Sequence, residues 1–247
     1  MKLDFYHWSC QCPLNFEMVN LLSEYAGKID IAITDITERS DIAKEHKIFF
    51  PTLTVVNGVH RFFSPLKKSF LDELAKNNIP VEKPYIPIQG TDIIHYEIKP
   101  LTRENYFLAS SCTGRENYLH YYKKQLFYDK YNQDIYGFIN TDDPILYGGA
   151  EYLPSLTVPY DIPKDEKYAF ITCVYMTDPR YDYKSAPLME LENYLRQNYE
   201  RVYVISDESG SFPNGNMDFF LRNNYVDEGL ISVEENYCRL HLMSKKL

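Results

Sequence analysis

A cluster of prolines near residue 80 divides this chain. Pro80, Pro84 and Pro87 fall within eight residues, in the stretch 79–90. Proline fixes φ and lacks a backbone N–H, so this spacing blocks regular structure and suits a stiff, extended linker. With 247 residues the chain is also long for a single core. We therefore expect two domains, 1–78 and 92–247, joined by a proline-rich linker over 79–91.

The composition indicates a folded protein with an acidic larger domain. Hydrophobic residues make up 45% of the chain, and the formal charge is −9. Residues 81–247 hold 25 acidic and 17 basic side chains, so most of the imbalance lies there. Such a field repels nucleic acid and anionic membranes and favours a small-molecule amine or a basic peptide as partner. No stretch of about 18 apolar residues and no secretion signal occurs, so we expect a cytoplasmic protein.

The cysteines and histidines argue against a disulfide scaffold and against a metal site. Five cysteines are an odd number, and apart from Cys10 and Cys12 they are widely scattered. The six histidines make no metal-type spacing with them. A structural zinc site needs about four clustered ligands, so we expect no bound metal.

Hydrophobic periodicity in the first part predicts the order βαβαββα. The expected strands are 2–7, 29–36, 49–58 and 59–63, and the expected helices are 15–25, 40–46 and 69–76.

Two motifs in this part resemble the thioredoxin-like superfamily. Residues 8–12 (WSCQC) stand at the start of a predicted helix, and 50–58 (FPTLTVVNG) follow about forty residues later. The resemblance implies a redox site of Cys10, Cys12 and Pro51, with Pro51 in the cis form. Ser9 stands where the family has its attacking cysteine. Three interpretations remain open: small residues in a domain kept for its fold, a CxC thiol pair, or metal or cluster binding.

The sequence pattern of the second part predicts a strand, a helical region and three strands, followed by a helix, a strand, a helix and a strand. The expected elements are 93–98, 115–129, 136–140, 145–153, 168–175, 185–198, 201–206, 216–223 and 237–243. Its tyrosines between 118 and 131 are unevenly spaced, which favours ordinary packing over a ligand platform.

Three segments of this part resemble the GNAT acyltransferase superfamily over 92–247. They are 180–189 (RYDYKSAPLM), which follows the strongest strand and opens a helix, 214–225 (NGNMDFFLRNNY) and 238–245 (CRLHLMSK). The resemblance implies a mixed-sheet α+β domain that uses acetyl-CoA. The fold class expected for the whole chain is therefore α/β, with a thioredoxin-like domain followed by a GNAT-like domain.

The family loop captures an anion, since backbone N–H groups at a helix N-terminus hold the pyrophosphate of coenzyme A. The cofactor-binding residues that the resemblance implies are Val174, Tyr175, Arg180, Tyr183, Ser185 and Ala186. Tyr183 takes the place of the first glycine of the family loop and would crowd the cofactor unless the loop follows another path.

Acyl transfer needs a base for the amine and an acid for the leaving thiolate. Phe220 stands at the position of the family's general-acid tyrosine and cannot donate a proton, which leaves Tyr175 and Tyr225 as alternatives. Glu151 is the first candidate base and Asp178 the second. A structural role for Glu151 is an equal alternative.

These residues lead to three hypotheses. The first is an N-acetyltransferase that moves an acyl group from acetyl-CoA to an amine, fused to a degenerate thioredoxin-like domain. The second is a non-catalytic binding module with both sites lost, and the third is a CxC thiol–disulfide switch. The sequence leaves the oligomeric state open, homo-oligomers included.

Overall fold

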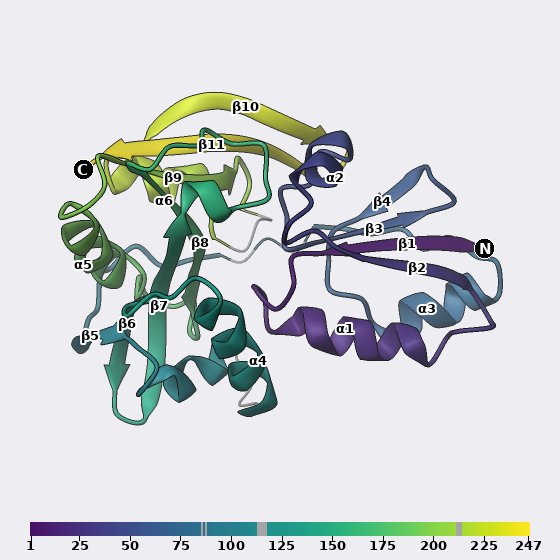
Figure 1. Cartoon of the computed structure of the whole chain (residues 1–247), viewed down its shortest axis with the longest axis horizontal. Helices are drawn as coiled ribbons and strands as arrows, with labels where there is room; N and C mark the ends of the chain where they lie inside the picture. Colours follow the sequence, from purple (N-terminus) through teal and green to yellow (C-terminus); the bar gives the residue numbers. More distant parts are fainter. Residues whose placement is uncertain (85, 87, 113–117, 211–213) are drawn as a thin grey trace. The chain divides into compact units, whose positions relative to one another are not determined.

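A computed structural model describes the chain except for residues 85, 87, 113–117 and 211–213, and it contains two compact units (Figure 1). The first unit is Met1–Pro84 with Pro159–Asp161, and the second is Tyr85–Val158 with Ile162–Leu247. No local sequence pattern predicted that Pro159–Asp161 would belong to the first unit.

The first unit has the predicted element order. Its elements are β1 (Lys2–His7), α1 (Leu14–Ser23), β2 (Asp30–Asp35), α2 (Ser40–Glu45), β3 (Thr52–Val56), β4 (His60–Phe62) and α3 (Lys68–Ala75). They build a sheet in the order β2-β1-β3-β4, in which β1 is parallel to β2 and antiparallel to β3. Leu3 and Phe5 of β1 form one core with Leu22 of α1 and Leu71 of α3. The order of elements predicted for residues 1–78 is therefore correct.

An aromatic contact anchors Pro159–Asp161 within this unit. The rings of Trp8 and Tyr160 meet edge to face with centroids 5.1 Å apart, and both side chains are buried. Lys44 and Asp161 form an ion pair at 3.2 Å beside them. Because the two rings are far apart in sequence, only the folded chain shows this contact.

The prediction that Pro51 is cis was wrong. The bond before Pro51 is trans, and the cis bond found among the described residues is Asp143–Pro144. The trans form of an X–Pro bond is favoured by about 0.5–1 kcal/mol. Pro51 fixes the cysteine turn in another way, since its carbonyl oxygen accepts hydrogen bonds from the Trp8 N–H at 3.0 Å and from the Asn15 amide at 3.3 Å.

The second unit is built on a seven-stranded sheet. Its elements are β5 (Glu97–Leu101), the 3₁₀ helix η1 (Tyr106–Ser111), α4 (Tyr118–Asp129), β6 (Gly137–Asp142), β7 (Ile145–Pro154), η2 (Ser155–Thr157), β8 (Tyr168–Met176), α5 (Ser185–Leu195), β9 (Arg201–Asp207), α6 (Met217–Arg222), β10 (Val226–Glu234) and β11 (Cys238–Lys246). The strand order is β10-β11-β9-β8-β7-β6-β5. Neighbours are antiparallel except β8 and β9, which run parallel.

Two strands differ from the sequence-based expectation. β10 was missed because its apolar residues Val226, Leu230 and Val233 are exposed and two register shifts interrupt its pairing with β11. The first strand begins at Glu97 rather than at residue 93, because Ile93 pairs with the loop at Asp182 instead. Both edges of the sheet thus depart from the simple alternating pattern.

Helices cover both faces of this sheet (Figure 1). On one face, Leu188 and Leu191 of α5 pack with Ala150 of β7 and Val174 of β8. On the other face, Tyr128 of α4 reaches Glu151, the residue after Ala150. Among the described residues, no helix is both long and apolar enough to cross a membrane.

His241 makes the stability of this unit dependent on pH. Its two ring nitrogens lie 3.0 Å from carboxylate oxygens of Asp227 and Glu208. Burial opposes the charged ring, but the hydrogen bonds to these carboxylates outweigh it and raise the pKa of His241. A raised folded-state pKa means that the stabilisation is complete below the unfolded-state pKa and is lost as pH rises through the folded-state pKa.

We therefore expect His241→Asn to lower the free energy of unfolding at about pH 5 and to lower it much less at about pH 9. Urea titrations of both proteins across this range measure the difference. The exposed His95 offers a matched control, His95→Asn. A loss that stayed constant with pH would contradict the charged pairing.

Candidate functional site

A β-bulge in β8 shapes the centre of the second unit. Glu151 of β7 pairs with Cys173, but the next residue, Tyr152, pairs with Ile171. Thr172 is therefore an extra residue in β8. A bulge of this kind bends the strand and redirects the side chains that follow it.

Beyond the bulge, β8 separates from β9. Their parallel pairing covers three residue pairs, from Tyr168 with Arg201 to Phe170 with Tyr203. Both strands continue, to Met176 and Asp207, without pairing to each other. We call the space between these diverging ends the strand opening. Backbone N–H and C=O groups that face it need partners from elsewhere.

Asn214 supplies partners to both sides of the strand opening. Its Oδ1 accepts a hydrogen bond from the Val174 N–H of β8 at 3.0 Å. Its Nδ2 donates to the Ile205 carbonyl of β9 at 3.4 Å. The side chain is buried, so one amide replaces a missing rung between the strands. The sequence-based resemblance included Asn214 but assigned it no role.

The predicted base Glu151 lies at the centre of a buried polar cluster. Its carboxylate is 2.8 Å from the ammonium of Lys124. It also accepts hydrogen bonds from the hydroxyls of Tyr128 at 2.6 Å and Tyr106 at 3.4 Å. Burial opposes the charge on Lys124, but Glu151 outweighs it and raises the pKa of Lys124 well above its usual value. The carboxylate of Glu151 is thus engaged by three donors.

Tyr175 lies on the same face of the sheet as Glu151. Burial, and then the charge of Glu151, raise the pKa of its phenol well above the usual value. Among the described residues, nothing hydrogen bonds to its hydroxyl. The ring lies against Gly149, where an added Cβ would stand 2.6 Å from the hydroxyl oxygen. Tyr175 is therefore a buried, neutral phenol whose hydroxyl has no hydrogen-bond partner among the described residues.

Other candidates on these elements are structural. Burial raises the pKa of the Cys173 thiol to about 12, so the thiol stays protonated. Phe220 and Tyr225 are buried in the core under α6. Tyr225 is close to Glu192, and burial raises its pKa well above the usual value.

Three other predicted site residues lie in the loop 178–185 and not in the polar cluster around Glu151. They are Asp178, Arg180 and Tyr183. Arg180 is exposed and forms an ion pair with Asp178 at 2.5 Å. The hydrogen bond from the Arg180 side chain lowers the pKa of Asp178, whose carboxylate also accepts a hydrogen bond from the Arg180 N–H at 2.9 Å. Tyr183 is buried with its ring 5.0 Å from that of Tyr147. Its side chain therefore fixes the loop from inside.

An internal carboxylate occupies the N-terminus of α5. Asp182 Oδ1 accepts hydrogen bonds from the N–H groups of Lys184 and Ser185, both at 3.0 Å, and Oδ2 accepts one from Ser185 Oγ at 2.6 Å. Asp182 and Ala186 are both buried. Sequence reasoning missed Asp182, although an acidic residue just before a helix is a known capping signal.

The arrangement fits coenzyme A in one part and not in another. The strand opening could hold an extended arm that carries amides, as the pantetheine arm does, if that arm took over the Val174 N–H and the Ile205 carbonyl from Asn214. The α5 N-terminus does not fit a diphosphate in this conformation, because Asp182 takes the N–H groups of Lys184 and Ser185.

Lys184 adds a buried positive charge beside the strand opening. Its side chain donates to the Asn214 carbonyl at 3.3 Å and lies 4.2 Å from the centroid of the Phe219 ring. Burial lowers the pKa of Lys184 to about 8. No sequence pattern marked Lys184, since lysines are common in loops.

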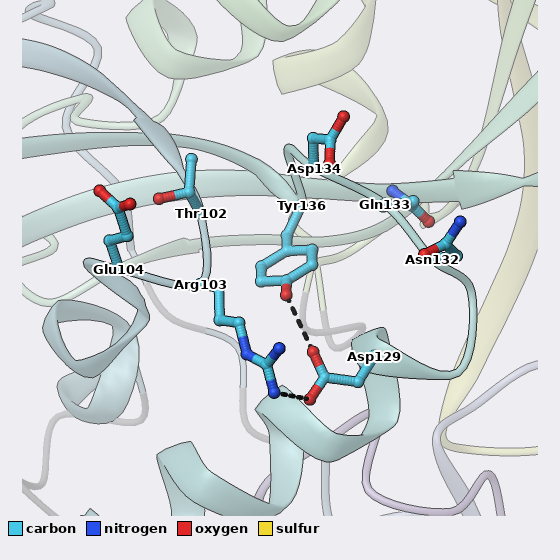
Figure 2. Close-up of a pocket in the computed structure, with 8 residues that line it drawn as sticks. All are labelled: Thr102, Arg103, Glu104, Asp129, Asn132, Gln133, Asp134 and Tyr136. Atoms are coloured by element: carbon cyan, nitrogen blue, oxygen red, sulfur yellow. Dashed lines mark hydrogen bonds and ion pairs between the residues drawn. The ribbon is translucent and has the colours of Figure 1, made fainter.

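Figure 2 shows a polar hollow elsewhere in the second unit, with a volume of about 500 Å³. It is lined by Thr102, Arg103, Glu104, Asp129, Asn132, Gln133, Asp134 and Tyr136. Asp129 accepts hydrogen bonds from Arg103 and Tyr136, both at 3.2 Å (Figure 2). Three carboxylates against one guanidinium make it attractive to cations, and none of the predicted site residues lines it.

In the first unit, Cys10 and Cys12 lie in the turn before α1 and are half-buried. All five cysteines of the chain are described, and none forms a disulfide. Ser9 has a positive φ of 39°, and its carbonyl accepts a hydrogen bond from Asn15 at 2.9 Å. Within the described part of the chain, no group of three His, Cys, Asp or Glu side chains is arranged to hold a metal ion.

Comparisons with known proteins find neither a matching family model nor a matching curated protein. Solved structures of GNAT-family N-acetyltransferases do match, over about 61% of this chain. A ribosomal-protein-alanine N-acetyltransferase from Brucella melitensis is 14% identical, covers 62% of this chain and 100% of its own, and has a TM-score of 0.45. The PaiA N-acetyltransferase from Thermoplasma acidophilum, in complex with coenzyme A, is 17% identical, covers 61% and 98%, and has a TM-score of 0.40. These scores are too low to assign a family.

Replacing Lys124 tests the buried ion pair. Lys124→Met leaves the Glu151 carboxylate buried and unpaired, so we expect the free energy of unfolding to fall by about 3–5 kcal/mol. The double variant Lys124→Met with Glu151→Leu removes both charges and should recover most of that loss. Chemical denaturation of the three proteins measures this. Equal losses in the single and double variants would contradict a coupled pair.

Replacing Asn214 tests the bridge across the strand opening. Asn214→Leu leaves the Val174 N–H and the Ile205 carbonyl unpaired, which should cost about 1–3 kcal/mol for a buried polar group. The exposed Asn193 on α5 provides a control, Asn193→Leu, expected within about 0.5 kcal/mol of wild type. Hydrogen exchange at the Val174 amide reports the bridge directly. Unchanged protection of that amide in Asn214→Leu would contradict it.

Proposed function

We propose that the second unit is an N-acyltransferase of the GNAT type, which transfers the acyl group of acetyl-CoA to an amine. The observation that carries this proposal is the strand opening. Two parallel strands at the centre of the sheet separate after a bulge, and the edges they expose are bridged by a single amide side chain.

The strand opening supports the choice of cofactor. Acetyl-CoA supplies an activated acyl thioester at the end of an arm that contains amides. Such an arm can offer the Val174 N–H and the Ile205 carbonyl the same acceptor and donor that Asn214 now offers. Val174, in this proposal, binds through its backbone, while its side chain stays in the core with Leu188.

Tyr175 is the candidate proton donor. Its phenol stays neutral over the physiological range because burial raises its pKa, and its hydroxyl has no partner among the described residues. A neutral phenol can protonate a leaving thiolate. Asp178 is tied to Arg180 in the loop, so we give it no catalytic role.

Glu151 is a positioning residue in this proposal. A base must have a free lone pair directed at the proton that it removes, and Glu151 is engaged by Lys124, Tyr128 and Tyr106. Its charge holds α4 on the sheet. It also keeps the neighbouring phenol of Tyr175 protonated, since the charge of Glu151 raises that pKa.

The acceptor is an amine. The acidic excess of residues 81–247 draws cations toward this unit. The carboxylates that line the hollow in Figure 2 would attract such a cation. The hollow lies next to the polar cluster, because the ring of Tyr136 stacks on that of Tyr128 with centroids 4.9 Å apart, and Tyr128 donates a hydrogen bond to Glu151.

The first unit is a thioredoxin-like domain in this proposal. The βαβαββα order and the central position of β1, between a parallel and an antiparallel neighbour, support it. Cys10 and Cys12 are its candidate thiols, and Pro51 contributes through its carbonyl oxygen.

An acetyl-transfer assay tests the proposal. The purified chain, given acetyl-CoA and a panel of small amines and lysine peptides, should release free coenzyme A together with acetylated product. Tyr175→Phe should lower kcat by about 10²-fold or more if the phenol is the acid. Tyr168→Phe, on the same strand, is the matched control and should leave kcat unchanged.

Binding of coenzyme A without product over the whole panel would favour a non-catalytic binding module instead. Turnover that survives in Tyr175→Phe would remove Tyr175 from the mechanism while leaving the activity in place.

A further inference from the structure

Residues 90–94, which begin at the end of the proline-rich stretch, are joined to the loop 178–185 by backbone hydrogen bonds. The Gly90 N–H donates to the Pro179 carbonyl at 2.8 Å. The Asp182 N–H donates to the Asp92 carbonyl at 2.9 Å, and the Ile94 N–H donates back to the Asp182 carbonyl at 3.1 Å. We call residues 90–94 the strap. Asp182 is hydrogen bonded to the strap through both its N–H and its carbonyl oxygen.

Glycine at position 90 makes this approach possible. An added Cβ there would stand 2.0 Å from the Arg180 carbonyl oxygen, a backbone atom that cannot move aside cheaply. Any other residue would push the strap off the loop. The contact therefore depends on the amino acid at position 90.

A buried amide fastens the strap and the loop together. Asn140 of β6 donates from Nδ2 to the Ile94 carbonyl at 2.9 Å and to the Tyr183 carbonyl at 3.4 Å. Its Oδ1 accepts from the Tyr96 N–H at 2.9 Å. Asn140 is fully buried. Strap and loop thus share one anchor on the sheet.

The strap holds Asp182 where an anion would bind. A helix N-terminus attracts negative charge through its unpaired N–H groups. Here Asp182 takes two of these groups and the Ser185 hydroxyl, and the ammonium of Lys184 is buried close by. The positive end of α5 is already neutralised by the chain itself.

We propose that the strap and Asp182 form an autoinhibitory closure of the second unit, in which Asp182 occupies the place of the cofactor's diphosphate. This inference rests on the proposed function, because it concerns the same α5 N-terminus. Coenzyme A must compete with a carboxylate that is covalently part of the site, so its apparent affinity is reduced by the fraction of molecules that are open. When the strap is released, the Asp182 carboxylate can move away from the N-terminus of α5.

Two variants of the full chain open the closure by different means. Gly90→Ala displaces the strap and keeps the carboxylate, whereas Asp182→Ala removes the carboxylate and keeps the strap glycine. Thr91→Ala, on an exposed strap residue, and Glu166→Ala, on an exposed carboxylate of the same unit outside the loop, are the controls. Calorimetric titration with coenzyme A gives the Kd of all five proteins. Amide hydrogen exchange at Asp182 and Ile94 reports whether the strap is released.

We expect Gly90→Ala and Asp182→Ala to bind coenzyme A at least about tenfold more tightly than wild type, with both controls unchanged. The Asp182 and Ile94 amides should exchange faster in Gly90→Ala. Released amides without any gain in affinity would overturn the closure, as would a wild-type Kd equal to that of both variants.

The outcome separates this inference from the proposed function. Tighter binding in both variants without acetyl transfer to any amine would support the closure and reject the acyltransferase. Acetyl transfer by wild type with no gain in either variant would do the opposite. If Asp182→Ala fails to fold because Lys184 loses its compensating charge, Gly90→Ala decides alone.

Discussion

The extra residue Thr172 in β8 is the constraint on which the second unit depends. Before the bulge, Ala169 and Ile171 face the α5 side of the sheet, and after it Val174 does. A regular strand would have placed Cys173 on that side, because side chains alternate with period two. The same bend ends the pairing with β9 after Phe170. The one inserted residue thus determines which side chains of β8 face α5, and it also creates the strand opening.

The polar cluster under α4 follows from that geometry. The bulge turns the Thr172 hydroxyl toward Tyr128, 3.1 Å away, and Tyr128 in turn donates to Glu151. A carboxylate buried among aromatic rings needs a counter-charge, and Lys124 of α4 provides it. Such a pair adds less stability than its Coulomb energy suggests, because both ions lose their hydration. Its effect is on geometry, since α4 has one position in which Lys124 reaches Glu151.

Local sequence patterns predicted most elements, because periodicity and capping act over a few residues. The strands at β1 and β8 and the helices at α1 and α5 were found within two or three residues of their ends. β10 escaped because it is an edge strand with exposed apolar residues, so it lacks the alternation that marks a buried face. Tyr160 in the first unit escaped because its partner Trp8 is about 150 residues away in the chain.

For the candidate site, the sequence named residues but could not show how they are paired. The sequence selected Glu151 and Tyr175, and the structure places them on one face of the sheet. The sequence could not show that Lys124 forms an ion pair with Glu151, because residue spacing carries no information about pairing between a helix and a distant strand. Pro51 illustrates a further limit, since a motif names a residue without fixing its peptide bond.

In the acyltransferase that we propose, the departures of the loop 178–185 from the GNAT family loop act together. Tyr183 stands where the GNAT family has glycine, and its buried ring fixes the loop. The residue before it therefore lies at the N-terminus of α5. That residue is Asp182, whose carboxylate satisfies the two N–H groups that a small loop would leave for a phosphate. A carboxylate held on the same chain competes at a high effective concentration, so an external anion succeeds only when its own contacts exceed that advantage or when the chain moves. Gly90 permits the backbone contact that holds this arrangement, because a side chain at position 90 would collide with the Arg180 carbonyl oxygen.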